Sequence, residues 1–222
     1  MVTRKAGAGP AGRKYHGLIP QERARQRRAA LLVAALQVFA EQGYASSSVK
    51  QICGVAGLTE RYFYESFTDR EGCLAALYSH LVDQMRAATL SALVSAQVDI
   101  DEQARAGLHA FIGYLTEDPR RARVVLVEVV GVSAAMEQRR HGVLREFADI
   151  VANTWATSRA EPLTSTQQST AVALVGGVNH LLVDWLMTGS VQRPTDLAEV
   201  CATLFSAARE RLEASPTSAP NT

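Results

Sequence analysis

Apolar residues recur at steps of three and four positions through most of this 222-residue chain, which is the spacing that one face of an α-helix requires. Ala, Leu and Val dominate the composition, which also favours helices. We therefore expect an all-α fold. The pattern predicts long helices over residues 21–42, 71–98, 101–117, 133–155, 167–188 and 195–214, with shorter helices between them.

Two short helical patterns flank a glycine-containing break between residues 47 and 70. Ser47 or Ser48 is a good N-cap for the first pattern, and Gly57 permits the tight turn that follows it. Thr59 is a suitable N-cap for the second pattern, Glu60–Ser66. The stretch therefore predicts a helix-turn-helix whose second helix presents side chains outward.

Charge is distributed unevenly along the chain. Residues 1–70 hold 11 Lys and Arg against 5 Asp and Glu, whereas residues 71–222 hold 12 against 17. A polyanion would therefore meet the N-terminal third; the alternative is a solvated basic tail. Residues 1–20 are predicted to be a flexible basic arm and residues 215–222 a disordered tail.

Several classes of protein find no support in the sequence. Cys53, Cys73 and Cys201 are far apart and lack metal-ligand spacing, which argues against disulfides or a metal site and fits a reducing cytoplasm. The sequence contains no run of about 18 apolar residues, so we expect no membrane span. Nucleophile, metal and phosphate-loop motifs are missing, so we expect neither an enzyme nor a cofactor. An enzyme or scaffold with a vestigial helix-turn-helix stays the alternative.

An ordered series of motifs in residues 21–80 closely resembles the DNA-binding domain of the tetracycline-repressor (TetR) family, in a variant associated with actinomycetes. The series is Gly43-Tyr44, Ser47-Ser48-Val49-x-x-Ile52, Ala56-Gly57-Leu58-Thr59, Phe63-Tyr64-x-x-Phe67, Arg70-Glu71 and Leu74. The resemblance implies a three-helix helix-turn-helix domain over residues 21–70 and a helical ligand-binding and dimerisation domain over residues 71–214. It also implies a homodimer on double-stranded operator DNA, most simply a repressor that a small ligand releases.

The resemblance supplies phosphate-contacting positions, and the outward face of the second short helix supplies base-facing ones. Arg61 can read guanine, or it simply pairs with Glu65 four residues on; both interpretations stay open. Glu60 replaces a commonly basic residue, and Ser66 stands where histidine is usual. The candidate DNA-binding residues are Arg28, Tyr44, Ser47, Ser48, Thr59, Glu60, Arg61, Tyr62, Tyr64, Glu65, Ser66 and Arg70.

The second domain is rich in Val, Leu and Phe, which predicts a mostly apolar pocket for a small hydrophobic effector. Glu128 interrupts an apolar run, and a carboxylate buried without a partner is costly. It therefore turns outward, pairs with an arginine or lines the pocket. The candidate pocket residues are Phe111, Leu115, Glu128, Phe147, Trp155, Asn179 and His180.

The last two long helices are strongly apolar, and the helix over residues 167–188 is so almost all round. Two such helices suit a four-helix dimer interface, as in the family. The alternative is ordinary core within one chain. The candidate interface residues are Val178, Leu182, Trp185, Leu197, Cys201, Leu204 and Phe205.

Overall fold

The computed structural model describes residues 20–96, 99–157 and 162–214. Every regular element within these ranges is helical, which confirms the predicted all-α fold. The elements are α1 (Pro20–Gln42), α2 (Val49–Ala56), α3 (Glu60–Ser66), α4 (Arg70–Ser95), α5 (Ile100–Glu117), α6 (Pro119–Arg123), the π-helical turn η1 (Val124–Glu128), α7 (Ala134–Ala156), α8 (Ser165–Met187) and α9 (Pro194–Ala214). The predicted basic arm, apart from Pro20, and the predicted tail lie outside the described residues.

Side-chain caps decide where several helices begin. Asp69 and Asp99 each accept a hydrogen bond from a backbone N–H three residues on, at the starts of α4 and α5. Helix α8 begins at Ser165, earlier than predicted, because Thr164 and Gln167 form a reciprocal capping box.

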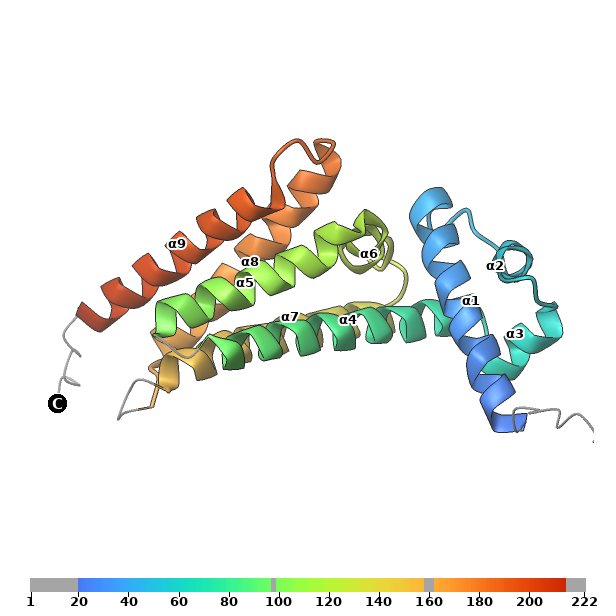
Figure 1. Cartoon of the computed structure of the whole chain (residues 1–222), viewed down its shortest axis with the longest axis horizontal. Helices are drawn as coiled ribbons and strands as arrows, with labels where there is room; N and C mark the ends of the chain where they lie inside the picture. Colours follow the sequence, from blue (N-terminus) through green and yellow to red (C-terminus); the bar gives the residue numbers. More distant parts are fainter. Residues whose placement is uncertain (1–19, 97–98, 158–161, 215–222) are drawn as a thin grey trace, which may run out of the picture.

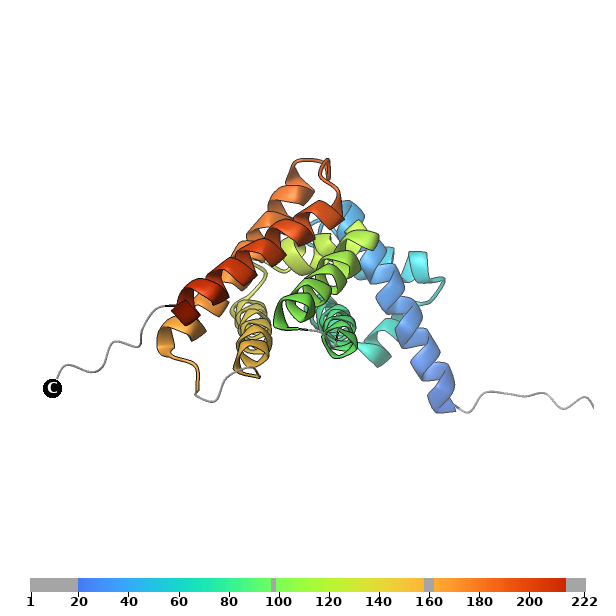
Figure 2. The ribbon, with the colours of Figure 1, turned by 60° about the vertical axis from the view of Figure 1, so that its left-hand side comes forward.

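Helices α1 to α3 gather at one end of the long helix α4, and α4 then continues into a bundle with α5, α7, α8 and α9 (Figure 1). Helices α8 and α9 pack side by side at the edge of this bundle (Figure 2). The proposed boundary between residues 70 and 71 falls at the start of α4. Since α4 serves both halves, the division into two domains stays a prediction.

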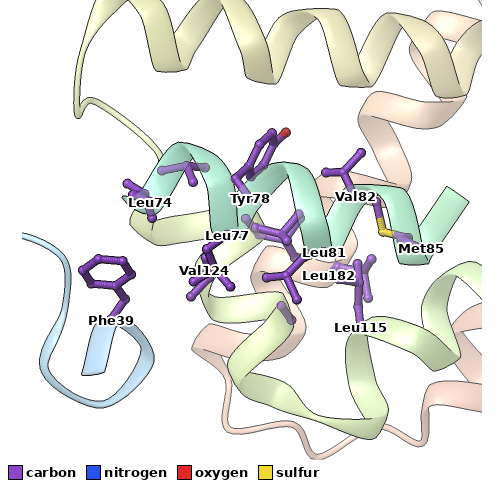
Figure 3. Close-up of a cluster of buried hydrophobic side chains, with 14 of the residues drawn as sticks. Phe39, Leu74, Leu77, Tyr78, Leu81, Val82, Met85, Leu115, Val124 and Leu182 are labelled. Carbon is purple, nitrogen blue, oxygen red and sulfur yellow. The ribbon is translucent and has the colours of Figure 1, made fainter. Parts of the chain in front are cut away.

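One hydrophobic core runs through both halves of the chain. Figure 3 shows α4 at its centre, with Phe39 of α1 near one end and Leu115 and Leu182 of the bundle near the other. Tyr78 is buried beside Leu74 and Leu81 on α4, and burial raises the pKa of its hydroxyl to about 12. A displacement of α4 would therefore disturb packing at both ends of the molecule.

The segment after Asp118 combines a predicted start with an unpredicted continuation. The Asp118 side chain accepts from the backbone N–H of Arg120 and Pro119 occupies the first turn of α6, as the sequence predicts. Residues Val124–Glu128 then form a π-helical turn. Such turns are rare and occur frequently at functional sites.

By length and composition alone, one described helix, α8, is apolar enough to cross a membrane. Core helices of soluble proteins pass the same test. Helix α8 packs against α7 and α9 within this bundle, so the test is weak grounds for a membrane span.

Candidate nucleic-acid interface and ligand cavity

The unit formed by α2 and α3 is closed by short-range hydrogen bonds. Ser48 is extended, and its hydroxyl accepts from the backbone N–H three residues on, at 3.3 Å. Gly57 takes a φ of 64°, the left-handed conformation that favours glycine. Leu58 donates its N–H to the carbonyl of Cys53 at 3.0 Å, and Thr59 leads into α3 in extended geometry. The result is the predicted helix-turn-helix.

Phe63 of α3 and Phe67, which directly follows α3, are buried, whereas the other face of α3 is exposed. Phe63 is fully buried, and its ring centroid lies 5.4 Å from that of Phe67. Glu60, Arg61 and Tyr64 are exposed, and 57% of Tyr64 is accessible. These outward side chains are therefore free to meet another molecule without unpacking the core.

Two arginines share the carboxylate of Glu65. Arg61 Nε lies 3.1 Å from Glu65 Oε1, and an Arg27 nitrogen lies 3.7 Å from Glu65 Oε2. The Arg27 guanidinium also stacks 4.3 Å from the ring centroid of Tyr62. The negative charge of Glu65 is therefore largely compensated by the two arginines. The half-buried ring of Tyr62 packs against Arg27 of α1.

The pairing of Arg61 with Glu65 is the geometry of the free chain. An exposed pair four residues apart on a helix stabilises it by only about 0.3–0.5 kcal/mol. A bidentate contact to guanine contributes roughly 1–3 kcal/mol of discrimination. Because the second magnitude is larger, the ion pair does not prevent Arg61 from reading a base.

The turn between α1 and α2 is built from three of the candidate DNA-binding residues. Ser47 Oγ donates to the carbonyl of Tyr44 at 2.7 Å. Arg70 donates to the carbonyl of Ser47, and its guanidinium lies 4.4 Å from the Tyr44 ring centroid. Ser47 is only 4% exposed. Its assignment to a phosphate contact is therefore corrected: the hydroxyl is used inside the turn.

The remaining candidate DNA-binding residues differ in how exposed they are and in whether they already make a contact within the chain. Thr59 is exposed, with no side-chain cap hydrogen bond. Ser48 is exposed but caps α2. Ser66 is half-buried and donates its hydroxyl to the carbonyl of Tyr62 at 3.0 Å. Arg28 is exposed and lies 5.1 Å from the ring centroid of Phe67.

An apolar cavity of about 60 Å³ lies within the bundle of α4, α5, α7, α8 and α9. The Phe111 and Phe147 rings meet edge to face across it, with centroids 5.0 Å apart. The hydroxyls of Thr89 and Thr154 each donate to a carbonyl of their own helix. The lining is therefore almost entirely hydrocarbon; it comprises Thr89, Leu93, Ala104, Gly107, Leu108, Phe111, Phe147, Ile150, Val151, Thr154, Trp155, Val175, Val178 and Phe205.

The cavity excludes four of the seven residues predicted to line it. Leu115 is fully buried in the packed core instead. Asn179 and His180 lie one and two residues beyond Val178, so the helical turn carries them away from the lining, and His180 is exposed. Glu128 lies near α1 and pairs with Arg123 at 2.8 Å, so of its three possible roles, pairing with an arginine is the observed one.

Helices α8 and α9 expose a stripe of small and apolar residues. Val172 and Met187 on α8 are 41% and 57% exposed, and Val200 and Leu204 on α9 are 46% and 52% exposed. Ala173 and Gly176 between them are also exposed, so the centre of the α8 stripe is narrow. Such a stripe leaves apolar surface area exposed to water unless another surface covers it.

Most of the predicted interface residues lie on the other side of these helices. Of the seven, only Leu204 belongs to the exposed stripe. Val178 and Phe205 line the cavity, and Trp185 donates its indole N–H to the carbonyl of Gln192 within the chain. For the buried six the interpretation as ordinary core is correct; they are Val178, Leu182, Trp185, Leu197, Cys201 and Phe205.

Among the described residues, the other reactive side chains are not gathered into a site. The three cysteines are buried, and burial raises the pKa of the Cys73 thiol to about 12 and that of Cys201 to about 11. In the part of the chain that the structure describes, no group of three or more His, Cys, Asp or Glu could hold a metal ion.

Residues 31–77, which run from the middle of α1 into α4, match the family described as bacterial regulatory proteins, tetR family. This range contains the whole helix-turn-helix. The helix-turn-helix region of the chain is similar to that of the tetR family. The predicted resemblance is thereby confirmed.

Known proteins extend the similarity beyond that domain. The chain is 30% identical over 126 residues to the HTH-type transcriptional activator FasR of Mycolicibacterium smegmatis, covering 56% of this chain and 55% of that one. The chain thus spans about half the length of that relative. It is 22% identical over 184 residues to the HTH-type transcriptional regulator AcrR of Shigella flexneri, covering 75% and 81%.

A solved structure shares the fold of this chain. The regulator FadR from Bacillus subtilis, solved in complex with stearoyl-CoA, matches with a TM-score of 0.71 and 19% identity, over 80% of this chain and 96% of that one. At this identity the match supports the arrangement of helices and not the chemistry of individual side chains.

Two basic residues in the DNA-binding half were not among the candidates. Arg27 holds α1 against α3 through Tyr62 and Glu65, and Lys50 is exposed in the first turn of α2. Lys50 could have been found, because it directly follows the helix start. Arg27 could not, since its role depends on how α1 crosses α3.

Proposed function

We propose that this chain is a homodimeric transcriptional regulator that binds operator DNA through α2 and α3 and is released by a small hydrophobic ligand. The observation that carries the proposal is the course of α4. Its first residue, Arg70, stacks on Tyr44 in the DNA-facing turn, and its Thr89 and Leu93 line the apolar cavity. One helix therefore connects the two candidate sites.

The exposed stripe on α8 and α9 supports the homodimer. A two-fold axis through such a stripe would pair it with its own copy and form a four-helix interface. A dimer would also present two copies of α3, which can enter successive major grooves about 34 Å apart. The proposed interface centres on the exposed residues Val172, Gly176, Val200 and Leu204. The buried residues that the sequence pattern suggested are not part of it.

The cavity lining supports a ligand with an aliphatic chain. No lining hydroxyl is left without an acceptor, so a polar ligand would gain few hydrogen bonds there. The free volume of about 60 Å³ is well below the ~150 Å³ of an apolar cavity that binds benzene. A long chain must therefore displace side chains or helices, which is how binding can change the conformation.

Stearoyl-CoA in the FadR complex makes a fatty acyl thioester the first ligand class to test. We propose repression as the default, although the FasR relative is named an activator. Such a regulator would work in the cytoplasm. The alternative of an enzyme or scaffold with a vestigial helix-turn-helix is not favoured, because the outward residues of α3 and the cation Arg70 are all in place.

Fluorescence anisotropy with the DNA upstream of the chain's own gene tests the first part. The dimer should prefer this DNA over a scrambled duplex, and its affinity should fall steeply between about 50 mM and about 200 mM salt. An absence of salt-sensitive, sequence-selective binding would overturn the proposal.

A further inference from the structure

Glu128 joins the end of η1 to the turn that follows α1. Its Oε2 accepts a hydrogen bond from the backbone N–H of Tyr44 at 2.7 Å, although the two residues are 84 positions apart. Its Oε1 accepts from Arg123 Nε at 2.8 Å. The Glu128 side chain is only 10% exposed, so its bond to Tyr44 is partly sheltered from water, whereas the Arg123 side chain is 44% exposed.

The Tyr44 N–H needs an acceptor because of how α1 ends. Gly43 takes a φ of 81° and donates its own N–H to the carbonyl of Phe39 at 3.1 Å. This left-handed residue turns the chain out of the helix, which leaves the following N–H without a helical partner. The carboxylate of Glu128 supplies the acceptor, so a side chain of the ligand-binding half completes a helix end in the DNA-binding half.

The Tyr44 turn in turn positions the DNA-facing residues. The Tyr44 carbonyl accepts from Ser47, whose own carbonyl accepts from Arg70. Ser48, next in the chain, caps α2. A shift of the Tyr44 backbone would therefore move the start of α2 and the guanidinium that stacks on the Tyr44 ring.

On its other side, η1 is embedded in the ligand-binding half. Val124, Val125 and Leu126 are buried, and η1 packs against α1, α4 and α8. Helix α8 also supplies Val175 and Val178 to the cavity lining. A ligand that displaces α8 would therefore act on the segment that carries Glu128.

We infer that Glu128 is a positioning residue for DNA binding, which holds the Tyr44 turn in place from the ligand-binding half. This inference rests on the proposed function. The π-helical turn sets the direction in which Glu128 points, so a change in the register of η1 would withdraw the carboxylate from Tyr44 and loosen the start of α2.

Glu137 provides a matched control. Its carboxylate also accepts from a backbone N–H, that of Gly131 at 2.8 Å, and from an arginine, Arg140 at 3.2 Å. It lies at the start of α7 and makes no hydrogen bond to the Tyr44 turn. Glu137→Ala therefore removes the same kind of contact without touching the DNA-facing turn.

The test measures DNA affinity and amide exchange on the full-length dimer. Glu128→Ala should weaken binding to upstream and scrambled DNA by about tenfold each, and Glu128→Gln, which keeps an acceptor for Tyr44, by much less. Glu137→Ala should leave the affinity unchanged. In free protein, hydrogen exchange at the Tyr44 amide should be slow in wild type and Glu137→Ala but fast in Glu128→Ala.

Two affinity results would overturn the inference: wild-type DNA affinity in Glu128→Ala, or an equal loss in Glu137→Ala. Fast exchange at the Tyr44 amide of the wild-type protein would also overturn it. The exchange experiment needs no DNA. If the wild-type chain bound no DNA, the proposed function would fail, while slow exchange at Tyr44 would still establish the contact on which the inference depends.

Discussion

The outward face of α3 and the outward face of α8 and α9 differ in chemistry. On α3 the exposed residues are charged or aromatic, and Arg27, Arg61 and Glu65 hold one another in place. On α8 and α9 the exposed stripe is formed by apolar residues such as Val172, Val200 and Leu204, with small residues on α8. The first face suits a charged, hydrogen-bonding polymer, and the second suits a copy of itself. Under the proposed function, DNA binding and self-association would therefore use different faces of the molecule, since α3 lies at the end away from the bundle that contains α8 and α9 (Figure 1).

The largest expected effect comes from a charge in the apolar stripe. Leu204→Glu would place carboxylates near the two-fold axis without partners, and we expect dimerisation to weaken by roughly 100-fold or more. Sedimentation velocity measures the change. Val191→Glu, at an exposed position in the loop between α8 and α9, is the control and should stay dimeric. A dimeric Leu204→Glu protein would show that the stripe is not the interface.

The next effect concerns the cavity. Phe147→Ala removes one of the two rings that meet across it and should lower the free energy of unfolding by about 3–5 kcal/mol. Stearoyl-CoA should restore part of the loss by filling the enlarged space, because a ligand that binds only the folded state stabilises it. Chemical denaturation with and without ligand measures both. A smaller gain with stearoyl-CoA than in wild type would argue against the cavity as the ligand site.

A smaller effect separates base reading from phosphate binding on α3. Arg61→Ala should cost about 1–3 kcal/mol on the preferred duplex and much less on a scrambled one. Tyr64→Ala should weaken both, since its exposed ring is assigned to the backbone. Anisotropy titrations on the two duplexes measure the split. Equal losses on both duplexes for Arg61→Ala would mean that Arg61 only pairs with Glu65.

The smallest effect depends on pH and concerns Asp118, which caps α6. The hydrogen bond from the Arg120 side chain is the main cause that lowers the pKa of Asp118 below its ordinary 3.8. A carboxyl with a lowered folded-state pKa stabilises the fold above the unfolded value, and that contribution is lost as the pH falls through the folded pKa. Asp118→Asn keeps the N-cap oxygen and should cost less than about 1 kcal/mol at neutral pH.

Denaturation at neutral pH and in acid measures this cost. The difference between Asp118→Asn and wild type should shrink towards zero in acid. A difference that did not change with pH would assign the effect to capping rather than to charge.

Local signals were sufficient for the helix-turn-helix. Ser48 and Gly57 act on neighbouring residues, so the start and end of α2 could be predicted closely. The burial of Phe63 and Phe67 follows from their four-residue spacing. Ser47 was misjudged because its acceptor, the Tyr44 carbonyl, depends on how the turn folds.

In the second half of the chain, long-range packing determines which faces and side chains point inward, and the sequence pattern does not predict this. Helix α8 is apolar almost all round, so composition alone cannot separate the side that meets the cavity, at Val175 and Val178, from the side left exposed, at Val172. Glu128 posed the same problem, because its partner Tyr44 is 84 residues away. The π-helical turn that aims it had no sequence signal that we recognised.

The most direct test of coupling through α4 is to measure DNA affinity with stearoyl-CoA and with acetyl-CoA, which shares the polar group but lacks the long chain. We predict that stearoyl-CoA binds the dimer and lowers its affinity for the preferred DNA by at least about tenfold, whereas acetyl-CoA leaves this affinity unchanged. Stearoyl-CoA binding that stabilised the dimer yet left DNA affinity unchanged would contradict it.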